Sequence, residues 1–313
     1  MSAVDVLALG EAMVEFNQAR ADAPDQYLRG FGGDTSNMAI AAARLLGSRG
    51  TAGYVSRVGD DAFGRMLREL WQREGVDTSG VAVDPAAPTG VYFVTHGAAG
   101  HEFAYMRAGS AASRISPETL PLEQISAARV LHVSGIGQAI SASACDAVLA
   151  AVAAAGASGT QVSYDPNFRA KLWPLARARA VIMATIAECD WFLPSYDEAK
   201  LLSGYADTAA IIDWCHALGA PVVALKRGGT GVVVSDGRRR EEIPGHQVEC
   251  IDATGAGDCF DGAFAVRILA GDTAFAAARY ANAAAALATT GFGAVAPLPR
   301  DTEVRKLLDS APG

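Results

Sequence analysis

The feature that most constrains the fold is the alternation of two kinds of segment along most of the 313-residue chain. Short apolar segments rich in β-branched residues precede segments whose apolar residues recur with the helical period. Such alternation predicts βαβ units, and therefore an α/β fold with a mostly parallel sheet covered by helices on both faces. The expected strands are residues 4–10, 129–135, 160–165, 190–195 and 221–226. The expected helices are residues 36–46, 62–74, 143–155, 175–188, 208–218, 258–270 and 273–289.

Residues 88–107 interrupt this alternation. Two runs with period-two alternation flank Gly97-Ala98-Ala99-Gly100, a pattern typical of a β-hairpin. A hairpin inserted between βα units cannot bury both of its faces in the main sheet. We therefore expect a small separate sheet that covers a site or makes a subunit contact. On this interpretation residues 1–313 form one domain, and its lid comprises about residues 11–31 and 85–110.

Charge and composition exclude several classes of protein. The chain has 26 Lys and Arg against 34 Asp and Glu, a net charge of −8 without basic runs, which argues against binding to nucleic acid or to an anionic membrane surface. Apolar runs long enough for a membrane helix do not occur in the sequence. Five scattered cysteines without a C-x-x-C pair predict free thiols rather than disulfides or a zinc site. The apolar residues 4–9 predict a strand rather than a signal peptide, so we expect a cytoplasmic protein.

The most informative loop is Asp-Ala-Thr-Gly-Ala-Gly-Asp at residues 252–258. Glycines at 255 and 257 allow a tight turn with outward-facing amides, and the helix that follows adds the positive end of its dipole. This arrangement predicts an anion site. Asp258, which closes the loop, can cap the helix, or it can accept a proton from an attacking hydroxyl. The loop by itself leaves both interpretations open.

Other polar loops occur at similar places along the chain. Gly-Gly-Asp-Thr-Ser-Asn at 32–37 opens an expected helix, where it can bind ligand hydroxyls or simply form a turn and an N-cap. Lys-Arg-Gly-Gly-Thr-Gly at 226–231 can cradle a phosphate or form a β-turn. Residues 164–169 and 195–198 follow expected strands, at the edge of a parallel sheet where ligands bind.

Two common nucleotide-binding motifs are absent or incomplete. Residues 133–140 partly match a dinucleotide fingerprint, but Ile140 replaces the third glycine and Asp165 lies too far along the chain. A nicotinamide-dependent dehydrogenase is therefore disfavoured. The sequence also contains no Walker P-loop, so a nucleoside triphosphate would need a different cradle.

These loops, in this order, resemble those of the ribokinase-like (PfkB-type) carbohydrate kinases over nearly the whole chain. Gly32-Gly33 is similar to the family's first signature, and residues 252–258 are similar to its second, more specific one. Gly-Glu-Ala-Met-Val-Glu-Phe at 10–16, residues 32–37, Tyr105-Met106-Arg107 and residues 165–169 resemble 2-keto-3-deoxygluconate kinases, and fructokinases share much of this pattern. The resemblance implies a three-layer fold with a small β-sheet lid, and a kinase that uses ATP and Mg²⁺.

The resemblance also implies roles at the reacting centre. Asp258 would be the catalytic base, and the amides of Gly255, Ala256 and Gly257 would stabilise the transferred phosphoryl group. The sugar would be held by Gly33, Asp34, Asn37, Tyr92, Tyr105, Arg107 and Arg169. Because a guanidinium pairs bidentately with a carboxylate, Arg107 and Arg169 favour 2-keto-3-deoxygluconate, phosphorylated at its terminal hydroxyl, over fructose. For Arg169 the alternative is contact with the ATP phosphates.

The remaining implied roles concern the nucleotide and cations. The nucleotide-binding residues would be Asn167, Ser195, Lys226, Gly228, Thr230, Gly231 and Asn282. Glu198 would bind Mg²⁺ through water, although Ser195 stands where the family has asparagine. Asp252 and Thr254 resemble residues that surround a monovalent cation, K⁺, in some members. The resemblance leaves two roles open for the lid: it pairs two copies of the chain in a homo-oligomer, or it serves as the flap of a monomer. The alternatives are a fructokinase or other sugar kinase, or a catalytically silent sugar-binding protein.

Overall fold

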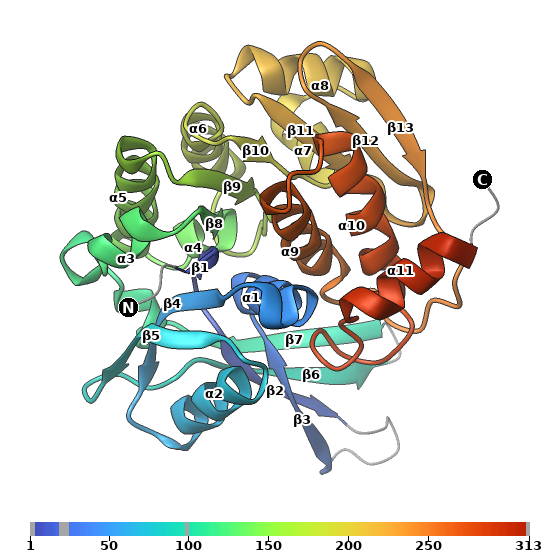
Figure 1. Cartoon of the computed structure of the whole chain (residues 1–313). Coiled ribbons are helices and arrows are strands. Elements are labelled where there is room, and N and C mark those ends of the chain that lie inside the picture. The colour runs from blue at the N-terminus through green and yellow to red at the C-terminus, as the bar shows by residue number, and fades with distance from the viewer. Residues whose placement is uncertain (1–3, 19–24, 98–99, 311–313) are drawn as a thin grey trace.

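The computed structural model describes residues 4–18, 25–97 and 100–310, and a nine-stranded sheet forms its centre (Figure 1). The strand order is β13-β12-β11-β10-β9-β8-β1-β4-β5. Neighbouring strands from β11 to β5 are parallel, whereas β12 and β13 are antiparallel to their neighbours. The strands are β1 (Val6–Leu9), β4 (Ala52–Gly59), β5 (Asp77–Asp84), β8 (Val130–Ser134), β9 (Gln161–Asp165), β10 (Trp191–Phe192), β11 (Val222–Lys226), β12 (Gly231–Ser235) and β13 (Arg240–Pro244).

Helices cover both faces of this sheet, which confirms the three-layer α/β prediction. On β1, Val6 and Ala8 belong to one core cluster, whereas Leu7 and Leu9 belong to the other. The first cluster includes α1 (Asp34–Leu46), α2 (Ala62–Arg73), α9 (Ala256–Leu269), α10 (Ala274–Ala288) and α11 (Asp301–Ser310). The second includes α3 (Leu122–Ala127), α4 (Gly135–Ala139), α5 (Ala142–Ser158), α6 (Leu175–Ile186), α7 (Tyr196–Ser203) and α8 (Thr208–Ala217). Within the described ranges, no helix is both long and apolar enough to cross a membrane.

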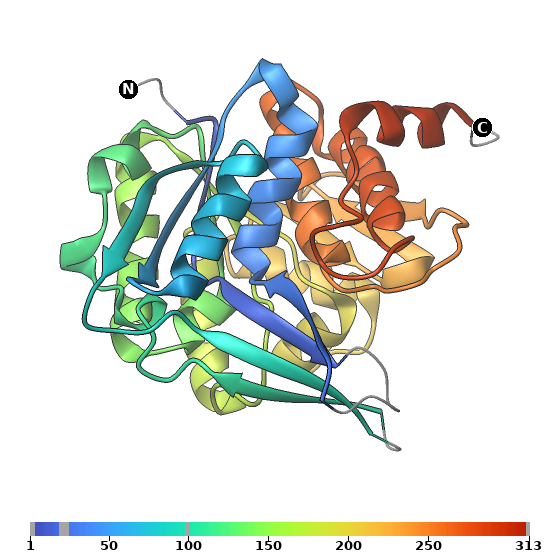
Figure 2. The same ribbon diagram turned by 90° about the horizontal axis from the view of Figure 1, so that it is seen from below.

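A second, four-stranded sheet has the order β3-β2-β6-β7 and lies across one end of the molecule (Figure 2). It consists of β2 (Met13–Gln18), β3 (Tyr27–Gly32), β6 (Val91–Gly97) and β7 (Gly100–Met106). The expected hairpin is present as the antiparallel pair β6–β7, and β2 runs parallel to β6. Residues 19–24 and 98–99, which fall within the expected lid segments, lie outside the described residues. We call this element the small sheet.

Some expected elements differ from those observed. Residues 190–195 form a strand only at Trp191–Phe192, because Ser195 caps α7 instead. Strands β4 and β5 were not predicted, since their sequences mix small, polar and charged residues with few apolar ones. The partial dinucleotide fingerprint forms the short helix α4, whose N-cap is the Ser134 hydroxyl.

Helices α1 and α9 pack unusually close together at Gly262. A Cβ at this position would lie 2.8 Å from the carbonyl oxygen of Met38 on α1 and 3.1 Å from the Cβ of Ala41. Glycine is therefore required for the two backbones to approach this closely. The contact lies one helical turn beyond Asp258 on α9, so it sets the separation between the predicted base and the first turn of α1.

Replacing Gly262 by alanine should separate the two helices. We expect Gly262→Ala to lower the free energy of unfolding by about 1–3 kcal/mol, the usual cost of overpacking, and to displace Asp258 from the first turn of α1. The matched control is Gly156→Ala in the exposed part of α5, where a Cβ meets nothing within 4 Å and stability should be unchanged or slightly higher. Urea unfolding measures both variants, and equal stabilities would contradict the packing argument.

Candidate active site

The candidate site begins at the N-terminus of α9. Gly255 is the N-cap in a left-handed conformation with φ 78°, and the helix starts at Ala256. Asp258 therefore lies within the first turn and is not the cap. Its carboxylate Oδ2 instead accepts a hydrogen bond of 2.8 Å from Asn37 Nδ2 on α1. The Gly255 and Gly257 amides lie with this carboxylate at the helix N-terminus, as a phosphoryl-transfer site requires, whereas the Ala256 amide donates to the Ala253 carbonyl at 3.2 Å.

Asn37 has a buried acceptor that is not paired within the described part of the chain. The residue is only 4% exposed, and its Nδ2 is engaged with Asp258. Its Oδ1 is buried and has no hydrogen-bond partner among the described residues. Buried polar atoms in native proteins are nearly always paired. A hydroxyl of a bound sugar would supply the missing donor.

A second pair of contacts connects the start of α1 to the end of β9. Asp34 Oδ2 accepts a hydrogen bond of 2.8 Å from Asn167 Nδ2, and Asp34 Oδ1 accepts one from the Thr35 amide. Asp165 Oδ1 in turn accepts from the Asn167 amide at 2.9 Å, which holds Asn167 at φ 32°. Asn167, expected to contact the nucleotide, thus lies beside the residues expected to hold the sugar.

The surroundings of Asp258 raise the pKa of its carboxyl group. Burial, followed by the charges of Asp34 and Asp165, raises the pKa of Asp258 to about 7. The Asn37 hydrogen bond and the Lys226 charge oppose this rise. A carboxylate with a pKa near the working pH is well suited to accept a proton from a hydroxyl.

The small sheet brings its own residues to the site. Tyr92 donates a hydrogen bond to Glu15, and its ring stacks on Tyr105 with centroids 5.6 Å apart. Arg107 forms an ion pair with Glu11, whose side chain is only 1% exposed. Sequence reasoning did not assign roles to Glu11 and Glu15. The signal was present, because a glutamate within an apolar strand segment is rarely buried without a partner.

Arg169 lies with the residues predicted to bind the nucleotide. Its side chain is 52% exposed and pairs with Glu198 Oε1 at 3.4 Å. Glu198 also forms a capping box with Ser195 at the start of α7. Arg169 is thereby positioned with residues expected to bind the nucleotide and its metal ion.

Four of the predicted nucleotide residues lie near the end of β13: Gly228, Thr230, Gly231 and Asn282. Residues 228–230 form a 3₁₀ turn, and Gly231 pairs with Pro244. Asn282 on α10 donates to the Pro244 carbonyl at 2.7 Å. Thr230 bonds within its own turn, to the Arg227 carbonyl. Lys226 lies apart from these four, near the first turn of α9, and its Nζ contacts Asp165 and Asp261, each at 2.9 Å.

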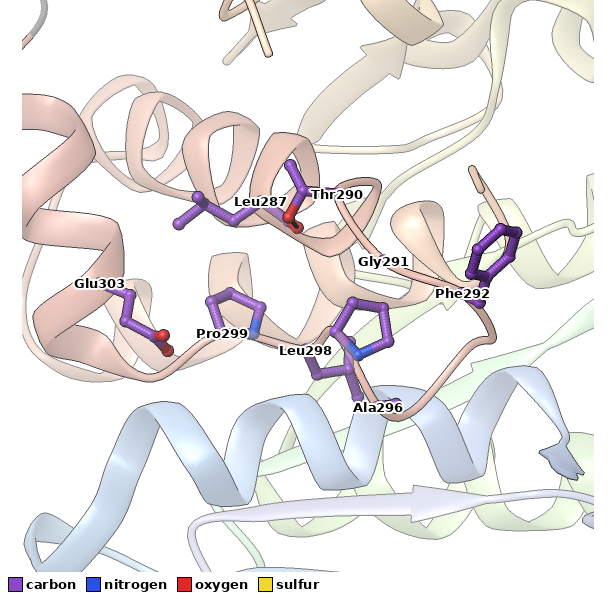
Figure 3. A pocket seen from close by; sticks show the side chains of 9 residues that line it. Leu287, Thr290, Gly291, Phe292, Ala296, Leu298, Pro299 and Glu303 are labelled. Carbon is purple, nitrogen blue, oxygen red and sulfur yellow. Dashed lines mark hydrogen bonds between the residues drawn. The ribbon is translucent and has the colours of Figure 1, made fainter. Parts of the chain in front are cut away.

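The loop that contains Asp252 and Thr254 is joined to the segment after α10. Asp252 Oδ1 accepts from the Thr254 amide and hydroxyl, and Asp252 Oδ2 accepts from the Gly293 amide at 2.9 Å. A separate cavity of about 420 Å³ lies along the same segment, above α1 (Figure 3). The cavity is lined by Leu287, Thr290, Gly291, Phe292, Ala296, Pro297, Leu298, Pro299 and Glu303. None of the predicted site residues lines it.

Comparison with known proteins decides the family. The sequence matches the pfkB family carbohydrate kinases over residues 4–301. The chain belongs to this family. It is 35% identical to fructokinase-1 of Oryza sativa subsp. japonica, over 98% of each chain, and 34% identical to 2-dehydro-3-deoxygluconokinase of Thermoproteus tenax, over 97% of this chain and 94% of that one. The structure of Xylella fastidiosa fructokinase with bound ATP superposes with a TM-score of 0.87, at 26% identity, over 97% of this chain and 98% of that one. The chain is thus a sugar kinase with the ribokinase-like fold.

Removing the Asp258 charge should stabilise this kinase at high pH. Because the folded-state pKa of about 7 exceeds the ordinary value of 3.8, the folded protein binds the proton more tightly, and wild-type stability falls as the pH rises between these values. We therefore expect the free energy of unfolding of Asp258→Asn to exceed that of wild type by more at pH 8 than at pH 5. The control is Asp197→Asn, an exposed carboxylate in the first turn of α7. Urea unfolding at both pH values tests this, and a pH-independent difference would contradict the raised pKa.

Proposed function

We propose that the protein is an ATP-dependent kinase that phosphorylates a primary hydroxyl of a neutral ketose, fructose. Membership of the PfkB family supports a sugar as acceptor, and the relatives named above include two fructokinases, one of them solved with bound ATP. The contact between Asp258 and Asn37 at the N-terminus of α9 supports phosphoryl transfer.

In the proposed reaction, the sugar hydroxyl lies against the Asp258 carboxylate, next to Asn37. The Asp258 carboxylate removes the hydroxyl proton as the oxygen bonds to the γ-phosphorus, and the bond from that phosphorus to the bridging oxygen of ADP breaks. The Gly255 and Gly257 amides donate hydrogen bonds to the phosphoryl oxygens as their negative charge develops. Asp34 and Asn37 position the sugar, and Tyr92 and Tyr105 face it from the small sheet.

The residues present fit a magnesium ion that arrives with the nucleotide. Within the described chain, no group of three or more His, Cys, Asp or Glu side chains is arranged to hold a metal. Glu198 offers one carboxylate near Asp165 and Lys226, which suits an ion that takes its other ligands from phosphates and water. When bound, Mg²⁺ would neutralise charge on the phosphates. A monovalent cation would bind to backbone carbonyls near Asp252 and Thr254, since the Asp252 carboxylate accepts from Thr254 and Gly293.

The ion pairs of two arginines support the choice of a neutral sugar. Arg107, expected to bind a sugar carboxylate, is already paired with the buried Glu11. Arg169, the other arginine of that expectation, pairs with Glu198 instead. An anionic sugar would have to compete with these carboxylates for both guanidinium groups. We therefore replace our sequence-based preference for 2-keto-3-deoxygluconate with fructose.

2-Keto-3-deoxygluconate stays as the second candidate. It is supported by the 34% identity to the Thermoproteus tenax enzyme over nearly the whole chain. An ADP-release assay with fructose and with 2-keto-3-deoxygluconate separates the two. We expect a higher kcat/KM on fructose, and a preference for the sugar acid would overturn our choice. Tight sugar binding without turnover would instead indicate a silent binding protein.

Asp258→Asn tests the proposed base. We expect kcat to fall by at least about 10²-fold, the low end for loss of a general base, while ATP still binds. Asp197→Asn is again the control, because it removes an exposed carboxylate distant in sequence from α9. Turnover of Asp258→Asn near the wild-type value would show that another group removes the proton.

Arg169→Ala tests whether this arginine contacts the nucleotide or the sugar. Since Arg169 pairs with Glu198, we expect a higher KM for ATP and an unchanged ratio of kcat/KM between fructose and the sugar acid. The exposed Lys171, two residues further on, provides the control variant Lys171→Ala. A selective loss of activity on the sugar acid would instead return Arg169 to the sugar site.

A further inference from the structure

A buried cluster of three charged side chains lies behind the anion cradle, and the proposed mechanism does not use it. Lys226 ends β11, Asp165 ends β9, and Asp261 lies on the second turn of α9. Lys226 Nζ donates to Asp165 Oδ2 and to Asp261 Oδ1, both at 2.9 Å. The carboxylates are 5% and 1% exposed. We call these residues the lysine triad.

The charges of the triad do not balance if every group is ionised. Two carboxylates and one ammonium would leave a net negative charge in a site that must accept the phosphates of ATP. Burying two like charges side by side is costly, so such carboxyl pairs retain one proton. His132, which is buried near Asp165 and Lys226, adds no charge, because burial lowers its pKa to about 4.

The electrostatic environment of each carboxyl agrees with one shared proton. The pKa of Asp261 is raised well above its ordinary value by burial, whereas the charge of Lys226 helps to lower that of Asp165. Both directions follow if Asp261 keeps the shared proton. The triad is then neutral as a whole, with the ammonium retained on Lys226.

The triad lies directly behind the candidate anion cradle. A Cβ on Gly257 would be 3.6 Å from Lys226 Nζ. An ammonium has three N–H groups, and the two carboxyls take two of them. Asp258 lies three residues before Asp261, on the same side of α9, and senses both the Asp165 and the Lys226 charge.

We propose that Asp261 is a positioning residue for phosphoryl transfer: with Asp165 it holds the Lys226 ammonium against the first turn of α9, and the two carboxyls carry one negative charge between them. Held in this position, the ammonium faces the ATP phosphates, and no second carboxylate charge is present to repel them. The proposal rests on the proposed function of Asp258 as base, and it assigns a role to a residue that sequence reasoning did not identify.

Two variants separate the hydrogen-bonding role of Asp261 from its charge. Asp261→Asn keeps a neutral side chain that can donate to Asp165 and accept from Lys226. We expect its kcat to stay within about threefold of wild type. In a plot of kcat against pH, the acidic limb should lie at the same pH as in the wild type. Asp261→Leu has a similar size but no hydrogen bonds, so Lys226 loses one of its two anchors. We expect kcat to fall at least tenfold with an unchanged KM for the sugar.

Groups that face the triad from other elements could also move the acidic limb: Asp34 on α1, His132 on β8, Glu198 on α7 and Asp258 on α9. They are unchanged in both variants. Asp272→Leu, which breaks the ion pair with Arg267 at the other end of α9, is the control. If Asp261 is ionised in the wild type, Asp261→Asn removes a negative charge and shifts the acidic limb to lower pH. Such a shift, or full kcat in Asp261→Leu, would overturn the proposal.

A measurement without turnover keeps this inference separate from the proposed function. At pH 9, where Asp258 is ionised, the wild type should show the infrared band of a buried protonated carboxyl, and Asp261→Asn should lack it. Absence of this band in the wild type would refute the shared proton even if Asp258 is the base. Conversely, an active Asp258→Asn variant would refute the base and leave the infrared result intact.

Discussion

The close contact between α1 and α9 is the constraint on which the rest of the site depends. Gly262 lets the α9 backbone approach the Met38 carbonyl, and one turn earlier Asn37 reaches Asp258. Neither helix could deliver both partners alone, because the residues are 221 positions apart in the sequence. The parallel sheet fixes the rest, since β9 and β11 end at the same edge and bring Asp165 and Lys226 beneath α9.

The candidate site is rich in carboxyl groups, yet its ligand carries phosphates. The charges of Asp34 and Asp165 act on Asp258, Asp165 also acts on Asp261, and the Lys226 ammonium lies among them. Oriented amides at the start of α9 and a nucleotide-bound cation would offset this negative character. The net charge of the chain is therefore a poor guide to its ligand, because short-range groups determine which charge can bind.

The sequence predicted the α/β alternation, the separate hairpin and the loop that contains Asp258, because each depends on local patterns of glycine and apolar residues. It did not identify Asp261 or Glu11, whose roles come from partners far away in the chain. A buried aspartate within a helix has no local signature that distinguishes it from a solvated one. We propose fructose rather than a sugar acid for the same reason, since the sequence shows an arginine but not the carboxylate that is paired with it.

The connection between the small sheet and α1 contains a single residue. Strand β3 ends at Gly32, α1 begins at Asp34, and Gly33 between them packs against the backbone of Glu11 and Ala12. A junction of one packed residue cannot change its conformation to accommodate a movement of the small sheet. A displacement of the small sheet would therefore turn the first helical turn of α1, and with it the amide that holds the Asp258 carboxylate. The small sheet and the contact between Asn37 and Asp258 therefore move together.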